Sequence, residues 1–461
     1  MRLPRPAGVE PRPLSTLAAA WPARLAGADI AVTGITATTA EVRPGDLFAG
    51  VPGRSGHGAR FATAALAAGA RAVLTDEPGR VLVPDSAPVL VVDEVRPALG
   101  PLAAMVYGRP SRSVSVLGVT GTSGKTTTTF LLRAGLAAAA QPAGLIGTVT
   151  TLLGDEPVMS GFTTPEAPEL QALLAVMRER GLRAVAMEVS SHALAMHRAD
   201  GIEFAVASFT NLSQDHLDFH ADIDDYFAAK ARLFDGRARA AVIVVDDEWG
   251  QRLAAMVGRR AVTVSSGAAD ATWRASEVTA HPDGSTAFRV LGPGVDLPAG
   301  CAVPGSYNVA NALLALAILA EAGVDLRLAA PALAQAVVPG RMERVAAGQP
   351  FLVVVDYAHK PAAVEGALRA LRPLTPGRLI IVLGCGGDRD RAKRPLMGEL
   401  AARNSDLLII TDDNPRSEDP ALIRQAMLAG ALAVPADARG EVLEVGDRAE
   451  AIGTAVAAAT P

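Results

Sequence analysis

The stretch that decides the fold is Gly118-Val-Thr-Gly-Thr-Ser-Gly-Lys-Thr-Thr-Thr-Thr129. It follows a β-branched run at 113–117 that predicts a strand, and it precedes a helical pattern at 130–139. Loops of this kind wrap polyphosphates, because backbone N–H groups reach phosphate oxygens only where glycine leaves room. The usual phosphate loop needs glycine at position 119, where this chain has Val. The stretch therefore predicts ATP binding through a variant phosphate loop.

Each polar residue type in this loop suggests a separate role. Lys125 supplies a cation to the β- and γ-phosphates, and the hydroxyl of Thr126 can ligate Mg²⁺. The other predicted nucleotide contacts in the loop are Gly121, Thr122, Ser123, Gly124 and Thr127.

Lysine is scarce in this chain. Of 43 basic residues only four are lysines, at positions 125, 230, 360 and 393. A surviving lysine is a candidate for a position where a guanidinium cannot substitute, although chance explains Lys360 and Lys393 equally well. Lys230 lies in a helical pattern at 224–234, far from the phosphate loop in sequence, and needs its own explanation.

Composition indicates a cytoplasmic enzyme of several domains. The length of 461 residues predicts about three domains. Half of the residues are hydrophobic, but no apolar run is long enough to span a bilayer, and no secretory signal is visible. The net charge of −5 offers no basic surface for nucleic acid, and two distant cysteines suggest neither a disulfide framework nor a metal site. We predict a monomer that binds neither nucleic acid nor membrane.

The order of predicted strands and helices indicates an α/β fold in three domains. Residues 1–110 mix short strands at 31–33, 72–75 and 89–92 with a helix at 61–68 and form a small α/β domain. Residues 111–338 alternate strands with helices, which predicts a central parallel sheet with helices on both faces. Residues 339–461 predict a Rossmann-like α/β domain that ends in a helix without a following strand. The strands predicted in the second and third blocks are 114–119, 185–189, 206–210, 241–245, 351–355, 379–383 and 407–411.

Two polar residues follow predicted strands of the central block, where α/β sheets place their ligands. Glu188 closes one strand, and His216 follows the next. Alone, either could be a capping glutamate or a core histidine. Together beside a phosphate loop, they favour a second Mg²⁺ site.

A series of short motifs makes the chain resemble one family throughout its length. They are Gly-Thr-Ser-Gly-Lys-Thr-Thr at 121–127, Thr-Thr-Pro-Glu at 163–166, Glu-Val-Ser-Ser-His at 188–192, Thr-Asn-Leu-Ser-Gln-Asp-His-Leu-Asp at 210–218, Gly-Ser-Tyr-Asn-Val-Ala-Asn at 305–311, Gly-Arg-Met-Glu at 340–343 and Asp-Tyr-Ala-His at 356–359. In this order and spacing they resemble the Mur ligases, the ATP-dependent amino-acid ligases of peptidoglycan precursor synthesis. The resemblance implies an amide-forming enzyme that passes through an acyl phosphate.

The resemblance also implies roles for residues that composition alone would leave unassigned. Lys230 matches a lysine that the family carbamylates, so that its carbamate joins Glu188 and His216 around the second Mg²⁺, while Thr126 ligates the Mg²⁺ of the nucleotide; a plain salt-bridging lysine is the alternative. Positions near the adenine, phosphates and ribose match Asn308, Arg341 and Asp356. Positions that hold the muramoyl-peptide match Thr163, Thr164, Ser190 and Arg198, for which helix capping and a surface arginine are the alternatives.

The N-terminal and C-terminal blocks carry the expected substrate contacts. The resemblance implies that the N-terminal domain, residues 1–110, binds the uridine diphosphate of the substrate. There Thr38-Thr39-Ala40 replaces the family's Asp-Ser-Arg, so Thr39 keeps a hydroxyl while the arginine is lost. In the third block, Asp-Asn-Pro-Arg at 413–416 resembles the branch that adds diaminopimelate to UDP-N-acetylmuramoyl-L-alanyl-D-glutamate. A guanidinium suits the distal carboxylate of diaminopimelate, which lysine lacks. The implied readers of this amino acid are Arg389, Asp413, Asn414 and Arg416.

Several alternatives stay open from the sequence. A related ligase could add L-lysine or another amino acid, or could lengthen folate polyglutamates. The third domain is also expected to be truncated, because Mur ligases continue with another strand and a Gly-Lys-Gly-His-Glu segment. A non-catalytic homologue that binds ATP or a UDP-sugar would fit that expectation, although such a protein has no need of a two-metal site.

Overall fold

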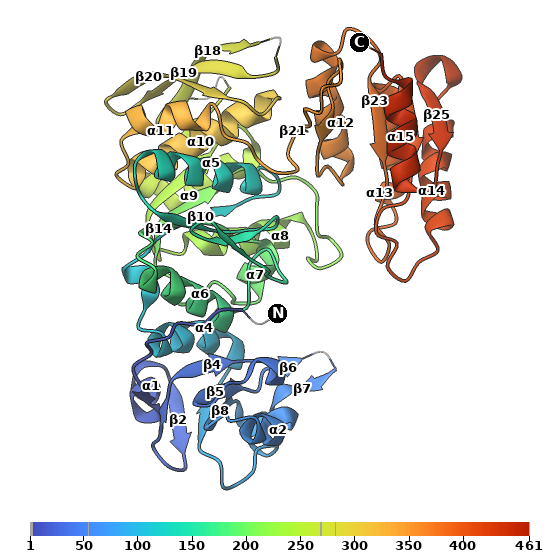
Figure 1. Ribbon diagram of the computed structural model, residues 1–461. Helices are drawn as coiled ribbons and strands as arrows, with labels where there is room; N and C mark the ends of the chain where they lie inside the picture. The colour runs from blue at the N-terminus through green and yellow to red at the C-terminus, as the bar shows by residue number, and fades with distance from the viewer. Residues whose placement is uncertain (1–2, 54, 268–269, 282, 461) are drawn as a thin grey trace. The chain divides into compact units, whose positions relative to one another are not determined.

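A computed structural model describes residues 3–53, 55–267, 270–281 and 283–460 (Figure 1). The chain forms two compact units. The first contains Met1–Ala275, Val290–Leu297 and Ala310–Leu333, and the second contains Ser276–Arg289, Pro298–Val309 and Ala334–Pro461. Among the described residues, no helix combines the length and the apolar character that crossing a membrane would require.

The N-terminal part of the first unit is built on a five-stranded sheet with strand order β2-β9-β8-β5-β4. Its strands pair in parallel except for β2, which runs antiparallel to β9. The predicted strands at 72–75 and 89–92 are confirmed, and the predicted helix at 61–68 forms over Ala62–Ala67. The elements are β1 Arg12–Pro13, α1 Leu14–Ala20, β2 Ala23–Ala26, β3 Ala31–Val32, β4 Gly34–Thr36, β5 Asp46–Ala49, β6 Pro52–Gly53, β7 Gly56–His57, α2 Ala62–Ala67, β8 Ala72–Thr75, α3 Glu77–Arg80, β9 Val89–Val92 and α4 Val95–Val106.

The central sheet has strand order β13-β12-β11-β14-β10-β15-β16-β17-β18-β19-β20. Its middle, from β11 to β18, is parallel as predicted. Helices flank it, with α5 packed on β14 and β11 and α9 packed on β16 and β17. The elements are β10 Ser115–Thr120, α5 Lys125–Ala138, β11 Ala143–Ile146, β12 Thr151–Leu153, β13 Glu156–Val158, α6 Ala167–Glu179, β14 Ala184–Glu188, α7 Ser191–Ala195, β15 Phe204–Phe209, α8 Ile223–Ala231, β16 Ala238–Val244, α9 Glu248–Val257, β17 Ala261–Ser265, β18 Trp273–Ala280, β19 Thr286–Gly292, β20 Val295–Cys301, α10 Ser306–Glu321 and α11 Leu326–Leu333.

The prediction of a wholly parallel central sheet is wrong at one edge. There β12 pairs antiparallel with β11, and β13 pairs antiparallel with β12. Only Gly154 and Asp155 separate β12 from β13, and Gly154 takes a φ of 72°. A two-residue turn of this kind reverses the chain, so the strands it joins must be antiparallel. The sheet is therefore mixed.

The second unit contains a parallel three-stranded sheet with strand order β23-β24-β25. Alternate residues of β24 point to opposite faces: Leu408 and Ile410 join the core that includes α13 and α14, while Leu407 and Ile409 pack with Ala451 of α15. The elements are β21 Glu343–Arg344, β22 Val354–Val355, α12 Pro361–Leu371, β23 Ile380–Leu383, α13 Lys393–Asn404, β24 Leu407–Ile410, α14 Pro420–Ala433, β25 Glu441–Glu444 and α15 Arg448–Ala458.

Two predictions for this unit need correction. The predicted strand at 351–355 shrinks to β22, which pairs only with β21 and does not join the three-stranded sheet. The short strand β25 was not predicted, because both of its ends are glutamates and its apolar stretch has only two residues. The final helix is confirmed.

Candidate active site

The phosphate loop leaves the carboxyl end of β10, a strand with parallel neighbours on both sides. Gly121 and Gly124 have φ values of 142° and 87°, which side-chain-bearing residues rarely adopt. A Cβ on Gly121 would collide with the Thr210 hydroxyl, and one on Gly124 would collide with the Asn311 side chain. Helix α5 then begins at Lys125. The glycines thus permit a tight loop at a helix N-terminus, which is an arrangement suited to phosphate oxygens.

Two lysine ammonium groups meet on one carbonyl oxygen of this loop. Lys125 Nζ donates to Gly121 O at 2.9 Å and to Thr122 O at 3.0 Å. Lys230 Nζ, from α8, donates to the same Gly121 O at 2.8 Å. Lys230 is only 1% exposed, and its ammonium lies 4.4 Å from the centre of the Tyr226 ring. The structure therefore brings Lys230 to the phosphate loop, although Lys230 lies 109 positions after Gly121 in the sequence.

Tyr226 is a residue of this site that the sequence analysis missed. Its hydroxyl lies 3.2 Å from Thr122 Oγ1, and burial raises the pKa of the phenol, so the hydroxyl stays protonated. Its ring lies 6.0 Å from the ring of His216. Tyr226 stands four residues before Lys230 on the same helix, and that i, i+4 spacing could have indicated a contact.

Glu188 ends β14 and faces the first turn of α5. Its carboxylate is 1% exposed and accepts hydrogen bonds from Thr126 Oγ1 at 2.9 Å and from Thr148 N and Oγ1 at 3.0 Å. A hydroxyl and a carboxylate in contact at a phosphate loop are a donor set that suits Mg²⁺. His216 lies beyond β15 with a φ of 55°, and its Nε2 is 3.1 Å from Asp215. Among the described residues no three His, Cys, Asp or Glu side chains form a metal-binding group, but the predicted set contains only two such side chains.

Three of the four residues predicted to hold the muramoyl-peptide, Thr164, Ser190 and Arg198, share one hydrogen-bond network. Thr164 Oγ1 donates to Glu188 O at 2.9 Å and accepts from Ser190 N at 3.1 Å, while Arg198 donates to Thr164 O at 3.3 Å. Arg198 is 8% exposed, so it is not a surface arginine. Ser190 caps α7 by accepting from Ala193 N, so the capping alternative is realised for this hydroxyl.

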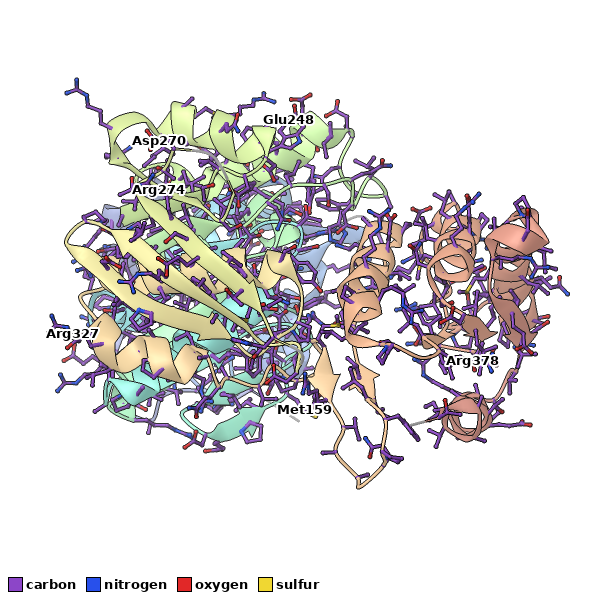
Figure 2. All side chains as sticks on the ribbon, turned by 90° about the horizontal axis from the view of Figure 1, so that it is seen from above. Met159, Glu248, Asp270, Arg274, Arg327 and Arg378 are labelled. Carbon is purple, nitrogen blue, oxygen red and sulfur yellow. The ribbon has the colours of Figure 1, made fainter. Side chains whose placement is uncertain are left out.

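The loop that carries Thr163 is more exposed than this network. Thr163 Oγ1 lies 3.0 Å from Thr148 Oγ1, and the Arg198 guanidinium lies 4.4 Å from the ring centre of the half-exposed Phe162. Met159, 80% exposed, projects from the same loop after β13 (Figure 2). Glu166, which the sequence analysis did not single out, binds Arg198 at 2.9 Å.

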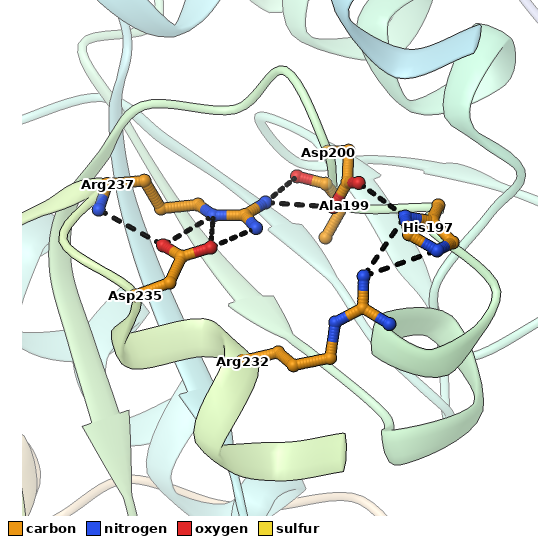
Figure 3. Close-up of polar contacts among 6 residues, drawn as sticks. All are labelled: His197, Ala199, Asp200, Arg232, Asp235 and Arg237. Atoms are coloured by element: carbon orange, nitrogen blue, oxygen red, sulfur yellow. Dashed lines mark hydrogen bonds and ion pairs between the residues drawn. The ribbon is translucent and has the colours of Figure 1, made fainter. Parts of the chain in front are cut away.

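A polar network joins the segment that follows α7 to the segment that follows α8 (Figure 3). His197 Nδ1 lies 2.7 Å from Asp200 and 3.0 Å from the Arg232 guanidinium. Arg237 donates to Asp200 at 2.9 Å and also pairs with Asp235. The network fastens the segment after α7, which includes Arg198, to the segment after α8, the helix that carries Lys230. No sequence motif indicated this connection.

The remaining predicted residues lie in three places. Thr39 begins a short 3-10 turn and is partly exposed. In the second unit, Asn308 Nδ2 donates to Pro304 O at 2.7 Å, Arg341 stacks on Tyr357 at 4.5 Å, and Asp356 accepts from Met342 N at 2.8 Å.

The residues predicted to bind the amino acid lie together in the loops after β23 and β24. Gly387 N donates to Asn414 O at 2.8 Å, and Arg416 Nη1 donates to Gly387 O at 2.6 Å. Arg389 is exposed on the first of these loops, and Asp413 precedes Asn414 on the second.

Comparison with known proteins agrees with this geometry. The chain matches the Mur ligase family catalytic domain at residues 31–107, the Mur ligase middle domain at 119–319 and the Mur ligase glutamate ligase domain at 340–461. The chain belongs to the Mur ligase family.

Individual relatives extend over nearly the whole chain. It is 53% identical to UDP-N-acetylmuramoyl-L-alanyl-D-glutamate--2,6-diaminopimelate ligase of Streptomyces avermitilis, over 99% of this chain and 91% of that protein. It is 45% identical to UDP-N-acetylmuramyl-tripeptide synthetase of Leifsonia xyli, with the same two shares. A solved structure of a UDP-N-acetylmuramoyl-L-alanyl-D-glutamate--2,6-diaminopimelate ligase aligns with a TM-score of 0.69 at 30% identity, covering 94% of this chain and 88% of that one. The resemblance and the three-domain α/β fold class are thus confirmed.

Proposed function

We propose that this protein is the ATP-dependent ligase that joins diaminopimelate to UDP-N-acetylmuramoyl-L-alanyl-D-glutamate in peptidoglycan precursor synthesis. The observation that carries this proposal is the 53% identity with the Streptomyces diaminopimelate ligase over 99% of the chain. The phosphate loop and Asp-Asn-Pro-Arg at 413–416 supply the two matching chemistries, ATP binding and carboxylate recognition. L-lysine as the substrate would offer Arg416 no distal carboxylate to bind.

The residues suggest how the reaction is organised. The phosphate loop and Lys125 bind ATP so that its γ-phosphoryl group transfers to the D-glutamate side-chain carboxylate. ADP leaves and an acyl phosphate forms. The amine of diaminopimelate then attacks the acyl carbon, the C–O bond to phosphate breaks, and the amide forms with loss of a proton and phosphate. The predicted muramoyl-peptide contacts Thr163, Thr164, Ser190 and Arg198 would orient the carboxylate for the first step.

A Mg²⁺ site fits the polar residues around the loop. We propose that Thr126 ligates the Mg²⁺ of the nucleotide and that Glu188, His216 and a carbamate on Lys230 hold a second Mg²⁺, since the Thr126–Glu188 contact places oxygen ligands of both sites together. When bound, the metal would reduce the repulsion between the anionic phosphates and the substrate carboxylate. A carbamate requires CO₂ to add to the amine of Lys230, with loss of a proton.

We propose that the nucleotide is contacted by Asn308, Arg341 and Asp356. Thr39 is proposed to contact the uridine diphosphate. Arg389, Asp413, Asn414 and Arg416 are proposed to bind diaminopimelate. We further propose that the protein works as a monomer in the cytoplasm, where its proposed nucleotide and amino-acid substrates are dissolved.

The test is phosphate release from ATP in the presence of UDP-N-acetylmuramoyl-L-alanyl-D-glutamate. We expect release with meso-diaminopimelate, and little release with L-lysine or without an amino acid. The control is the Lys125→Ala variant, which should release no phosphate in any of these mixtures because the loop has lost its cation. Equal release with L-lysine would refute the assignment to diaminopimelate, and release that needs no amino acid would refute ligation.

A further inference from the structure

Two loops of the second unit are fastened to each other by a glutamate that no motif singled out. Glu418 follows Asp-Asn-Pro-Arg on the loop after β24. Its Oε1 accepts the backbone N–H of Asp388, on the loop after β23, at 2.6 Å, and also accepts Arg394 Nη2 at 2.8 Å. Its Oε2 accepts Arg394 Nη1 at 3.1 Å and lies 3.2 Å from Arg391 Nη2. One carboxylate therefore holds three groups of the neighbouring chain segment.

The ion pair between Glu418 and Arg394 is sheltered and geometrically specific. Arg394 is 4% exposed at the start of α13, and both of its terminal nitrogens bind the same carboxylate. Such bidentate pairs fix direction as well as distance. The guanidinium of Arg394 and the N–H of Asp388 lower the pKa of Glu418 to about 2, so the carboxylate is ionised at any physiological pH.

The contacts of Glu418 with Asp388, Arg391 and Arg394 form a clamp between the two loops. The backbone of these loops is strained at two non-glycine residues. Asp388 and Arg416 have φ values of 50° and 51°, in the left-handed region that favours glycine. Residues held there persist only where surrounding contacts over-determine them, and they concentrate at functional sites. A second contact joins the same two loops, since the Asp388 carboxylate accepts hydrogen bonds from both Ser417 N and Ser417 Oγ.

The clamp is connected through the backbone to the residues predicted to bind the amino acid. Glu418 fixes Asp388, and the adjacent Gly387 carbonyl receives the Arg416 guanidinium at 2.6 Å. Arg389 follows Asp388 on the same loop. If Asp388 moved, the acceptor that holds Arg416 and the backbone that carries Arg389 would move with it.

We propose that Glu418, held by Arg394, is a positioning residue for amino-acid selection: it locks the two loops so that Arg389 and Arg416 are set for the distal carboxylate of the incoming diamino acid. The inference rests on the proposed function. It assigns Glu418 no contact with substrate. Its effect should therefore appear in the recognition of the amino acid, while ATP and the UDP-sugar bind normally.

The test compares wild type with Glu418→Gln and Glu418→Asp in steady-state kinetics for all three substrates. Glutamine retains the size of the side chain and an oxygen for Asp388 N, but loses the charge that orients Arg394. We expect the KM for meso-diaminopimelate to rise by about 10-fold or more, because small misplacements of orienting groups are costly. Glu418→Asp keeps the charge on a shorter stem and should give an intermediate value. The preference for diaminopimelate over L-lysine should fall in the same order.

The matched control is Glu441→Gln. Glu441 lies on β25 of the same unit, and the substitution breaks its exposed ion pair with Arg378. It should leave every KM within about 2-fold of wild type. An unchanged KM for diaminopimelate in Glu418→Gln would overturn the inference, and so would parallel increases in all three KM values, which would indicate a general structural role. A wild-type enzyme that turns over without needing diaminopimelate would instead overturn the proposed function, and this inference with it.

Discussion

The amine of Lys230 occupies a position that an arginine could fill only in part. It is buried against the Tyr226 ring and donates to Gly121 O, the carbonyl that Lys125 also binds. A guanidinium could still donate a hydrogen bond there, and it would keep the positive charge. It could not, however, add CO₂ to become a negatively charged metal ligand. Lys230→Arg therefore separates the structural role of this residue from the proposed chemical one.

We predict that Lys230→Arg folds with a melting temperature near that of wild type but loses turnover by about 100-fold or more, comparable to the cost of removing one preorganised oxyanion-hole donor. Phosphate release measures the loss. In ¹³C-bicarbonate, the wild-type enzyme should show a carbamate carbon signal by NMR that the variant lacks. Lys360→Arg, at the start of α12, is the control for a harmless lysine-to-arginine change. Near-normal turnover in Lys230→Arg would rule out the carbamate.

At the scale of elements, the sequence predicts best what a single local pattern determines. Strands buried on both faces, such as β8, β9 and β24, are short continuous apolar runs and were found with nearly the right ends. Strand β18 was missed because five of its eight residues are exposed and half of the eight are polar, so it forms no continuous apolar run. Helix α5 begins at Lys125 rather than near 130, because the polar end of the loop is already helical.

In the candidate site, too, features set by a local pattern could be predicted and contacts between distant residues could not. The phosphate-loop residues are consecutive, so their shared role could be predicted from spacing alone. Contacts between distant residues could not be predicted in this way: Thr122 meets Tyr226 across 104 residues, and Glu418 meets Asp388 across 30. Such pairs depend on how strands and helices are ordered in the sheet, and a single sequence does not reveal that order.

Helix α5 offers a test of why the residue just before its first turn, Gly124, is glycine. Gly124 and Gly181 both have positive φ values, 87° and 74°. An alanine Cβ would meet the Asn311 side chain at Gly124, but would find nothing within 4 Å at Gly181. Both substitutions should cost about 1–2 kcal/mol of backbone strain. Only Gly124→Ala should also raise the KM for ATP, by about 10-fold, because the loop must shift away from Asn311. Similar KM values for ATP in the two variants would show that the contact with Asn311 is unimportant.

At the scale of the whole molecule, the two compact units carry different natural reporters. Trp21, Trp249 and Trp273 all lie in the first unit, while Cys301 and Cys385 both lie in the second. Burial raises the pKa of each thiol to about 11, so the folded second unit should react slowly with thiol reagents at pH 8. Tryptophan fluorescence and thiol labelling can therefore follow the unfolding of the two units separately.

These reporters test the proposed nucleotide contacts. In a urea titration, a non-hydrolysable ATP analogue with Mg²⁺ should stabilise the first unit, which holds the phosphate loop, by about 2.7 kcal/mol at 100 times its Kd. The midpoint of the tryptophan transition should rise accordingly. If Asn308, Arg341 and Asp356 also bind the nucleotide, the thiol-labelling midpoint must rise as well, because all three belong to the second unit. A shift of the tryptophan transition alone would contradict those three assignments while leaving the loop's role intact. Lys125→Ala should abolish both shifts, which would tie them to nucleotide bound at the phosphate loop.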